Sequence, residues 1–349
     1  MSGASGRTVR DILVTGVTGF TGGALALELA RQGHRVRGLV RSREGIDQLF
    51  EAGVEPRDGD IRDADAVARA AEGVERIYHI AAVFRSAGYP DSYYEDVNTG
   101  GIANVIEAAR RHGVERVVHC STMGVHGHLS EVPGDETSPF NPGDIYQETK
   151  LAGERIAAAA FQNDVCGAIV RPMGIYGPGD LRFLKLFRAI RRGRFVMVGS
   201  GETLYHFAYI DDLVEGFILA GEHPEAPGGT YLIGGDEFIT LNELTRLIAE
   251  AVGARPPRWR VPVWPVMAAG ALCEAACRPL GLEPPLHRRR VAFFTKDRAF
   301  SNAKAKRELG FQPRVDMREG IRRTARWYFD QGLLEGEPPS ALRDSVTDD

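Results

Sequence analysis

The chain has 349 residues, of which 43% are hydrophobic and 26% are charged. This length suits two domains or one large α/β unit with an added lobe, and the composition excludes a disordered or fibrous chain. Acidic and basic residues are nearly equal in number and the formal net charge is −4. The chain therefore lacks the excess of Lys and Arg that is typical of a nucleic-acid-binding protein.

The first half of the chain alternates short apolar runs with amphipathic segments. Strands are predicted at 11–16, 34–41, 54–61, 76–82, 116–122 and 166–172, and helices at 23–33, 45–53, 66–73, 98–113 and 146–160. Successive strand–helix pairs at this spacing form right-handed βαβ units, which build a parallel sheet with helices on both faces. We therefore expect an α/β fold of the Rossmann type, with a doubly wound parallel sheet.

The pattern is looser after Pro172. Helices are predicted at 183–193, 211–221 and 241–253, and strands at 207–210 and 229–235. Residues 254–290 are rich in proline and arginine and are expected to be irregular, apart from the apolar run 261–276. That run falls short of the ~20 apolar residues that cross a bilayer, so no membrane span is predicted.

The four cysteines are too few for a disulfide scaffold and lack the spacing of metal ligands. No targeting segment is visible at 1–8. We therefore expect reduced thiols, no metal site and a cytoplasmic location.

A glycine-rich turn, GVTGFTG (16–22), joins the first predicted strand to the first predicted helix. Gly16 allows the tight turn, Gly19 lets the backbone approach a pyrophosphate, and Gly22 lets the helix pack closely on the strand. The helix N-terminus offers backbone N–H groups and a positive dipole end to the phosphates. The turn therefore predicts a dinucleotide cofactor.

The residues after the second and third strands bear on the choice of cofactor. Arg41 ends the second strand, where an acid would bind the ribose 2′-hydroxyl of NAD and an arginine suits the 2′-phosphate of NADP. NAD and NADP both stay open, and Arg41 favours NADP. Asp60 and Ile61 follow the third strand, where the carboxylate can accept a hydrogen bond from the adenine amine.

Two short motifs predict acid–base chemistry. In YQETK (146–150), Tyr146 and Lys150 share one helix face, and a nearby ammonium favours the phenolate. Such a tyrosine can exchange a proton with a carbinol at neutral pH. Ser121 and Thr122 end a preceding strand, where a hydroxyl would face the same carbonyl.

With these motifs the chain resembles the extended short-chain dehydrogenase/reductase family of epimerases, dehydratases and hydroxysteroid or dihydroflavonol reductases. The resemblance covers about Arg10 to Phe329. Further segments that resemble the family's motifs are CSTMGVHG (120–127), HIAA (79–82), the helix containing Asn98, RPMGIYGPGD (171–180), YIDDLVEG (209–216) and SNAKAKRELGFQP (301–313).

The resemblance implies hydride transfer between a substrate carbinol carbon and a nicotinamide ring. It implies Tyr146 as general acid–base, Lys150 as the residue that lowers its pKa, and Thr122 as a hydrogen-bond partner of the reacting oxygen. The implied cofactor-binding residues are Gly16, Thr18, Gly19, Phe20, Gly22, Arg41, Asp60, Ile61, Ala81, Ala82, Asn98, Lys150 and Pro172. The implied substrate-binding residues are Ser121, Arg182, Tyr205 and Arg298.

The resemblance also implies an order of domains and a homodimer. We assign 8–175 and 208–236 to the dinucleotide-binding Rossmann domain and 176–207 and 237–335 to a smaller C-terminal substrate-binding lobe. Residues 336–349 are predicted to form a mobile tail. Family members pair through the helices that begin near Asn98 and Tyr146.

Departures from the family's motifs reduce the number of reactions that the chain is expected to catalyse. Dehydratases follow the catalytic threonine with Asp-Glu, whereas this chain has Met123 and Gly124, which cannot move protons. The first hypothesis is an epimerase or oxidoreductase acting on a sugar-nucleotide-type substrate. The alternative is an NADPH-dependent ketone reductase, favoured by Arg41, by Tyr205 where an arginine often holds the diphosphate, and by the apolar run 261–276. The intact catalytic residues argue against a cofactor-bound regulator without turnover.

Overall fold

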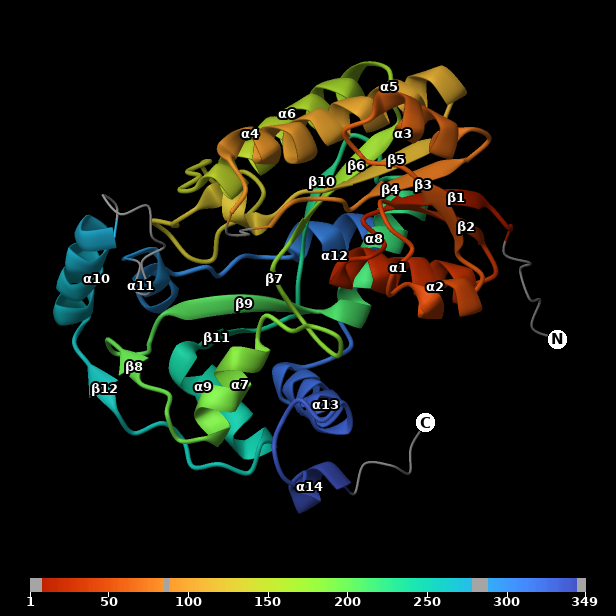
Figure 1. Ribbon diagram of the computed structural model, residues 1–349. Helices are drawn as coiled ribbons and strands as arrows, with labels where there is room; N and C mark the ends of the chain where they lie inside the picture. The colour runs from red at the N-terminus through yellow and green to blue at the C-terminus, as the bar shows by residue number, and fades with distance from the viewer. Residues whose placement is uncertain (1–7, 85–87, 278–287, 344–349) are drawn as a thin grey trace.

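The computed structural model describes residues 8–84, 88–277 and 288–343, and its centre is a seven-stranded sheet (Figure 1). All neighbouring strands in this sheet are parallel, which confirms the predicted doubly wound Rossmann-type fold. The strands, in sheet order, are β10 (Thr230–Ile233), β6 (Gly167–Pro172), β5 (Arg116–Cys120), β4 (Arg76–His79), β1 (Asp11–Thr15), β2 (Arg35–Val40) and β3 (Glu55–Asp58).

Helices cover both faces of this sheet, so its central strands are mostly buried. Ile12, Leu13 and Val14 of β1, for example, are fully buried. One face carries α3 (Ala64–Ala71), α4 (Asp91–Tyr94), the π-helical turn η1 (Glu95–Gly100), α5 (Gly101–His112) and α6 (Ile145–Asn163). The other carries α1 (Phe20–Arg31), α2 (Asp47–Glu51), α8 (Ile210–Glu222) and α12 (Ala303–Leu309).

The lobe is built on a second sheet of order β11-β9-β7, in which β7 and β9 are parallel and β11 and β9 are antiparallel. Its strands are β7 (Gly174–Tyr176), β9 (Leu204–Tyr209) and β11 (Phe238–Thr240), with a short pair of β8 (Met197–Val198) and β12 (Arg260–Val261). Its helices are α7 (Leu184–Arg191), α9 (Leu241–Ala251), α10 (Val263–Cys277), α11 (Arg288–Thr295) and α13 (Met317–Asp330). The chain enters the lobe after β6 and returns through α8 to β10.

The structure differs from the predicted elements mainly in the lobe. β7 was not predicted, and β9 begins at Leu204 rather than at 207. In the main part, Asn98 lies within η1, and the α-helix predicted from Asn98 begins only at Gly101. A short helix, α14 (Ser340–Arg343), lies within the tail that was predicted to be mobile. Leu342 is buried there, and its carbonyl accepts a hydrogen bond of 2.5 Å from Arg326. Residues 344–349 of that predicted tail lie outside the described residues.

Among the residues that the structure describes, none of the helices is long and apolar enough to cross a membrane.

Two buried histidines lie side by side in the main sheet. His79 of β4 and His119 of β5 are direct register partners, and their rings stack with centroids 5.3 Å apart. His79 Nδ1 lies 2.9 Å from Thr15 Oγ1, whereas neither ring nitrogen of His119 has a hydrogen-bond partner among the described residues. Burial lowers the pKa of His79 to about 3 and holds the pKa of His119 well below its ordinary value.

These depressed pKa values predict a loss of stability in acid. Below the ordinary histidine pKa of about 6.5, these two histidines are protonated in the unfolded chain but stay neutral in the folded chain. The free energy of unfolding therefore falls as pH falls. Each histidine contributes up to about 1.4 kcal/mol per pH unit. Urea unfolding should be measured at several pH values below about 6.5. The free energy of unfolding of His119→Leu should fall less steeply with decreasing pH than that of the parent, and His128→Leu, at an exposed position, is the control. Equal slopes for the two variants would contradict the assignment.

Candidate active site

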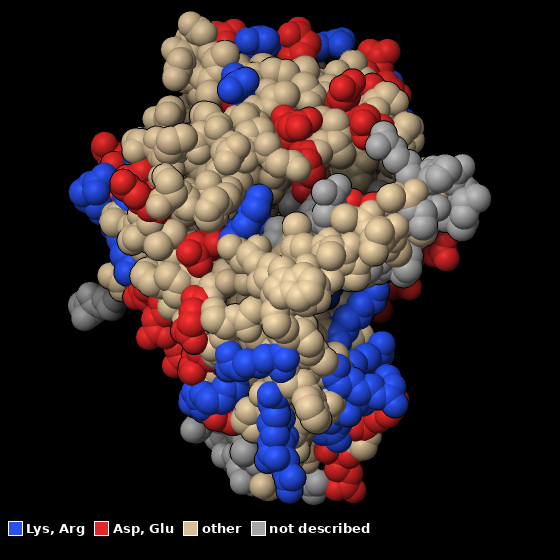
Figure 2. Space-filling model, turned by 90° about the vertical axis from the view of Figure 1, so that its left-hand side faces the viewer, with Lys and Arg blue, Asp and Glu red and all other residues tan. Residues whose placement is uncertain are grey.

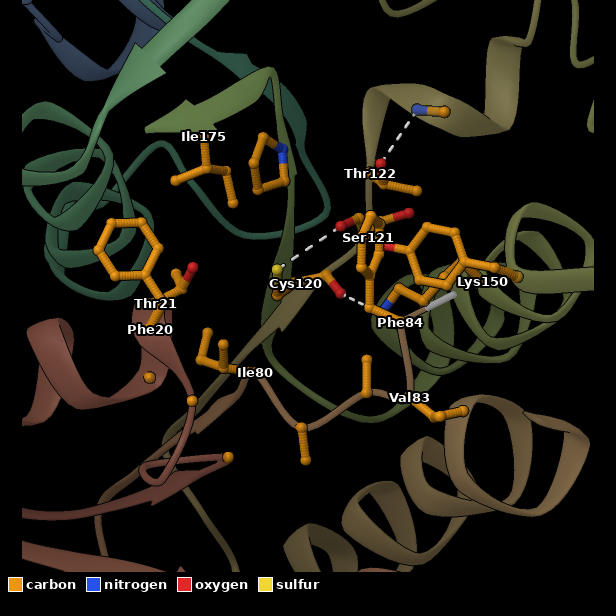
Figure 3. A pocket seen from close by; sticks show the side chains of 18 of the residues that line it. Phe20, Thr21, Ile80, Val83, Phe84, Cys120, Ser121, Thr122, Lys150 and Ile175 are labelled. Carbon is orange, nitrogen blue, oxygen red and sulfur yellow. Dashed lines mark hydrogen bonds between the residues drawn. The ribbon is translucent and has the colours of Figure 1, made fainter. Parts of the chain in front are cut away.

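A cavity of about 910 Å³ lies at the carboxyl ends of the main sheet's strands, between that sheet and the lobe (Figure 3). It includes the switch point where the strand order reverses around β1, the place where doubly wound sheets bind ligands. Of the residues predicted for the site, all line this cavity except Asn98.

Two positions in the glycine-rich turn cannot hold a side chain, because a Cβ there would clash with neighbouring backbone atoms. Gly16 has a φ of +75°, and a Cβ there would lie 2.7 Å from the backbone nitrogen of Ala81. A Cβ at Gly22 would lie 2.2 Å from the carbonyl oxygen of Gly16. Helix α1 follows with Gly19 as its N-cap and no acidic residue in its first turn. The turn and helix N-terminus therefore fit the pyrophosphate of a dinucleotide.

Charged and aromatic side chains contact one another at the end of the cavity that lies away from the lobe. Arg41 donates a hydrogen bond of 2.8 Å to the hydroxyl of Tyr93. The Asp60 carboxylate accepts two hydrogen bonds from the Arg62 guanidinium, at 3.1 and 2.8 Å, and this contact lowers the pKa of Asp60. Arg62 also lies 4.9 Å from the ring centroid of Tyr93. Sequence reasoning missed Arg62 and Tyr93, because their side chains come from different elements.

Side chains of Thr15 and Asn98 fix the backbone of residues 80–83, which follow β4, by hydrogen bonds. Thr15 Oγ1 accepts hydrogen bonds of 3.2 Å from the backbone nitrogens of Ile80 and Ala81. Asn98, almost fully buried, accepts a hydrogen bond of 2.9 Å from the nitrogen of Val83 and donates one of 3.2 Å to its carbonyl. Asn98 therefore fixes the cavity wall and does not itself line the cavity.

Helix α6 presents Tyr146 and Lys150 to the cavity from one face. The helix begins after Asp144, whose side chain caps it by accepting a hydrogen bond of 3.0 Å from the nitrogen of Gln147. Lys150 Nζ donates a hydrogen bond of 2.5 Å to the carbonyl of Cys120 at the end of β5. Because Lys150 is fully buried, desolvation lowers the pKa of its ammonium.

Ser121 and Thr122 follow β5 and lie near Lys150 in Figure 3. Thr122 Oγ1 accepts a hydrogen bond of 3.1 Å from the nitrogen of Gly124. The Tyr146 ring packs edge-on against Phe84, with ring centroids 4.9 Å apart. The structure thus brings the three predicted catalytic side chains to one cavity.

A buried polar network supports this wall. Ser121 donates a hydrogen bond to the Glu154 carboxylate, which also pairs with Arg171 at 2.5 Å. The side chains of Glu154 and Arg171 are only 5% and 4% exposed. Arg171 Nη1 lies 2.9 Å from His126 Nε2. Sequence reasoning missed this network, although a glutamate four residues after Lys150 on the same helix face was a signal.

The lobe end of the cavity is mostly apolar. Its lining includes Met123, Ile175, Phe183, Phe207, Phe293 and Phe300. The two arginines predicted to bind substrate already have protein partners. Arg182 pairs at 2.8 Å with the Asp180 carboxylate, which is 1% exposed, and Arg298 donates a hydrogen bond of 2.9 Å to the Tyr205 hydroxyl.

Comparison with known proteins places these features in a family. The NAD dependent epimerase/dehydratase family model matches residues 12–234. A 3 beta-hydroxysteroid dehydrogenase/Delta 5-->4-isomerase of Mycobacterium tuberculosis is 35% identical over 339 residues, covering 91% of this chain and 90% of the relative. A 2-alkyl-3-oxoalkanoate reductase of Stenotrophomonas maltophilia is 34% identical over 325 residues, covering 89% and 97%.

A solved structure of MoeE5 in complex with UDP-glucose and NAD shares the fold. Its TM-score is 0.72 at 25% identity, and the match covers 92% of this chain and 99% of that one. Because the family model spans most of the main sheet and the relatives align over nearly the whole chain, the protein belongs to the NAD-dependent epimerase/dehydratase family and is an NAD-dependent enzyme of the extended short-chain dehydrogenase/reductase type.

Proposed function

We propose that the protein is an NAD(P)-dependent dehydrogenase/reductase that interconverts a secondary alcohol and a ketone on a hydrophobic substrate, such as a steroid or a 2-alkyl-3-oxoalkanoate. The apolar lobe end of the cavity carries this proposal, because its aromatic lining suits an apolar body better than a diphosphate. The names of the two curated relatives point to the same class of substrate.

Three side chains are assigned to the chemistry. The dinucleotide, when bound, supplies or accepts a hydride at its nicotinamide ring. Tyr146 gives a proton to the ketone oxygen during reduction and takes it back from the alcohol during oxidation. The Thr122 hydroxyl hydrogen-bonds the same oxygen, and the Lys150 ammonium, held at the end of β5, favours the phenolate of Tyr146.

The dinucleotide is assigned to the opposite end of the cavity. The turn at Gly16, Thr18, Gly19, Phe20 and Gly22 would hold the pyrophosphate. The remaining proposed contacts are Arg41, Asp60, Ile61, Ala81, Ala82, Lys150 and Pro172.

Met123 and Gly124 line the cavity directly after Thr122. Neither side chain can supply the acid or base that elimination of water requires. This arrangement supports redox chemistry or epimerisation rather than dehydration.

A nucleotide-sugar epimerase is the second candidate, since MoeE5 shares the fold and its structure contains UDP-glucose and NAD. The pairing of Arg182 with the buried Asp180 weighs against it, because the guanidinium charge is already compensated. Binding a diphosphate at Arg182 would require that ion pair to be shared or broken.

One assay separates the two candidates. The purified protein is incubated with a 3β-hydroxysteroid and oxidised cofactor, with a 2-alkyl-3-oxoalkanoate and reduced cofactor, or with UDP-glucose. We expect turnover of at least one of the first two, with one cofactor consumed per product. Conversion of UDP-glucose without net cofactor consumption, and no reaction with the hydrophobic substrates, would instead establish the epimerase.

Arg41 is expected to favour NADP over NAD through the 2′-phosphate. An ion-paired hydrogen bond of this kind contributes about 1.5–3 kcal/mol, so Arg41→Ala should raise the KM for NADPH by about tenfold or more and change that for NADH little. Arg43→Ala is the matched control, because Arg43 pairs with Asp58 at 2.6 Å. Equal changes for both cofactors in Arg41→Ala would remove Arg41 from this role.

A further inference from the structure

The outward side of α10 is apolar, which is unusual for a surface helix. The helix sequence, VWPVMAAGALCEAAC, contains a single charged residue, Glu274. Its exposed residues are Trp264, Met267, Ala268, Ala269, Leu272 and Ala275. All of them except Ala269 fall on one helical face, here called the α10 face. Trp264 is 74% exposed and Leu272 is 73% exposed. A surface helix ordinarily turns polar residues outward, so this face is built for a partner.

The α10 face continues onto the neighbouring strand pair. Trp259, 73% exposed, directly precedes β12, and its carbonyl accepts a hydrogen bond of 2.9 Å from the nitrogen of Met197 in β8. Val196, beside Met197, is also exposed. Two exposed tryptophans thus lie on either side of β12 in the chain, directly before the strand and at the start of α10.

Basic side chains border this surface. Figure 2 shows Lys and Arg gathered below an uncharged area on the side of the molecule that carries α10. The segments next to the α10 face contribute exposed Arg194, Arg255, Arg258 and Arg260. Within the ranges that the structure describes, Arg194, Arg255 and Arg258 form no ion pair. This local excess of positive charge contrasts with the net charge of −4 for the whole chain.

The α10 face lies close to the lobe end of the active-site cavity. Helix α10 packs against α11, and Phe293 of α11 lines the cavity. The Phe293 carbonyl accepts a hydrogen bond of 2.7 Å from the Tyr205 hydroxyl. One helix therefore separates the apolar outer surface from the apolar end of the cavity.

We propose that the α10 face docks the protein on a lipid bilayer with anionic headgroups, with α10 lying along the bilayer surface. Tryptophan and leucine side chains insert at the boundary between headgroups and acyl chains, and arginines beside them bind the anionic headgroups. A symmetric contact with a second copy fits less well, because it would bring the same arginines towards each other. This docking does not depend on the proposed reaction, and it would place the cavity beside a reservoir of hydrophobic substrate.

Sedimentation of the full chain with vesicles tests the proposal. We expect binding to an equimolar mixture of phosphatidylcholine and phosphatidylglycerol, weaker binding to phosphatidylcholine alone, and release at high salt through screening. Binding should also shift tryptophan fluorescence to shorter wavelength. Trp264→Ser/Leu272→Ser and Arg255→Glu/Arg258→Glu should each lower the affinity for the mixed vesicles at least about tenfold.

Phe50→Ser is the matched control, because Phe50 is an exposed aromatic residue on α2, far from α10 in Figure 1. Its affinity should equal that of the parent, and circular dichroism should show that all variants are folded. The proposal fails if the parent stays in the supernatant with both vesicles, or if Trp264→Ser/Leu272→Ser binds as the parent does. It also fails if light scattering shows a dimer that only this double variant disrupts, since a second copy would then cover the face.

Discussion

Tyr146→Phe is expected to lower kcat by about 10²–10⁴-fold, the range typical of a lost general acid–base. The ring is retained, so its edge-on packing against Phe84 should persist. The glycine-rich turn lies elsewhere in the cavity and is unchanged, so the affinity for NAD(P)H should stay within about twofold. Steady-state kinetics on the substrate that turns over, together with cofactor titration, measure both quantities.

Tyr209→Phe is the control for the lost phenol. Tyr209 lies in β9 and does not line the active-site cavity. Turnover by this variant should match that of the parent. If Tyr146→Phe keeps most of the turnover, proton transfer belongs to another group and the assignment of Tyr146 is wrong.

Glu154→Ala is expected to lower the free energy of unfolding by about 3–5 kcal/mol, because it leaves the buried Arg171 guanidinium without its carboxylate. It also removes the acceptor of Ser121, next to Thr122, so kcat should fall as well. Urea unfolding at neutral pH measures the first effect. Glu243→Ala in α9, which breaks a partly exposed pair with Arg246, should cost no more than about 1 kcal/mol.

The double variant Glu154→Leu/Arg171→Met checks the cause. Replacing both charges removes the unpaired ion, so stability should recover relative to Glu154→Ala, while the effect on kcat should persist. If Glu154→Ala unfolds at the same urea concentration as the parent, the pair does not contribute to stability.

The parts of the site that lie in continuous sequence could be predicted. The turn GVTGFTG and the motif YQETK each depend on local geometry, a strand–turn–helix junction in one case and one helical turn in the other. Both therefore reach the cavity as expected. Thr122 was found because it closely follows a strand whose apolar run is plain in the sequence.

The contacts between distant segments could not be predicted in the same way. Ser121 follows β5, whereas Glu154 and Arg171 lie in α6 and β6. Their contact depends on strand register and on the rotation of the helix. Asn98 was placed at the cofactor, but its side chain bonds the backbone of Val83 beneath the cavity surface. Strand β7 is three residues long, too short for an alternating pattern to indicate it.

The path of the chain through the lobe makes the half that contains the main sheet discontinuous in sequence. Strand β10 pairs with β6 only after the polypeptide has passed through β7, α7 and β9. A fragment ending at residue 175 would therefore lack both β10 and α8. The edge of β6 that faces β10 would be unpaired, and the side of α1 that packs on α8 would be exposed. Such an open edge promotes aggregation. The two halves of this enzyme should accordingly be expressed together. We expect them to unfold as a single cooperative unit.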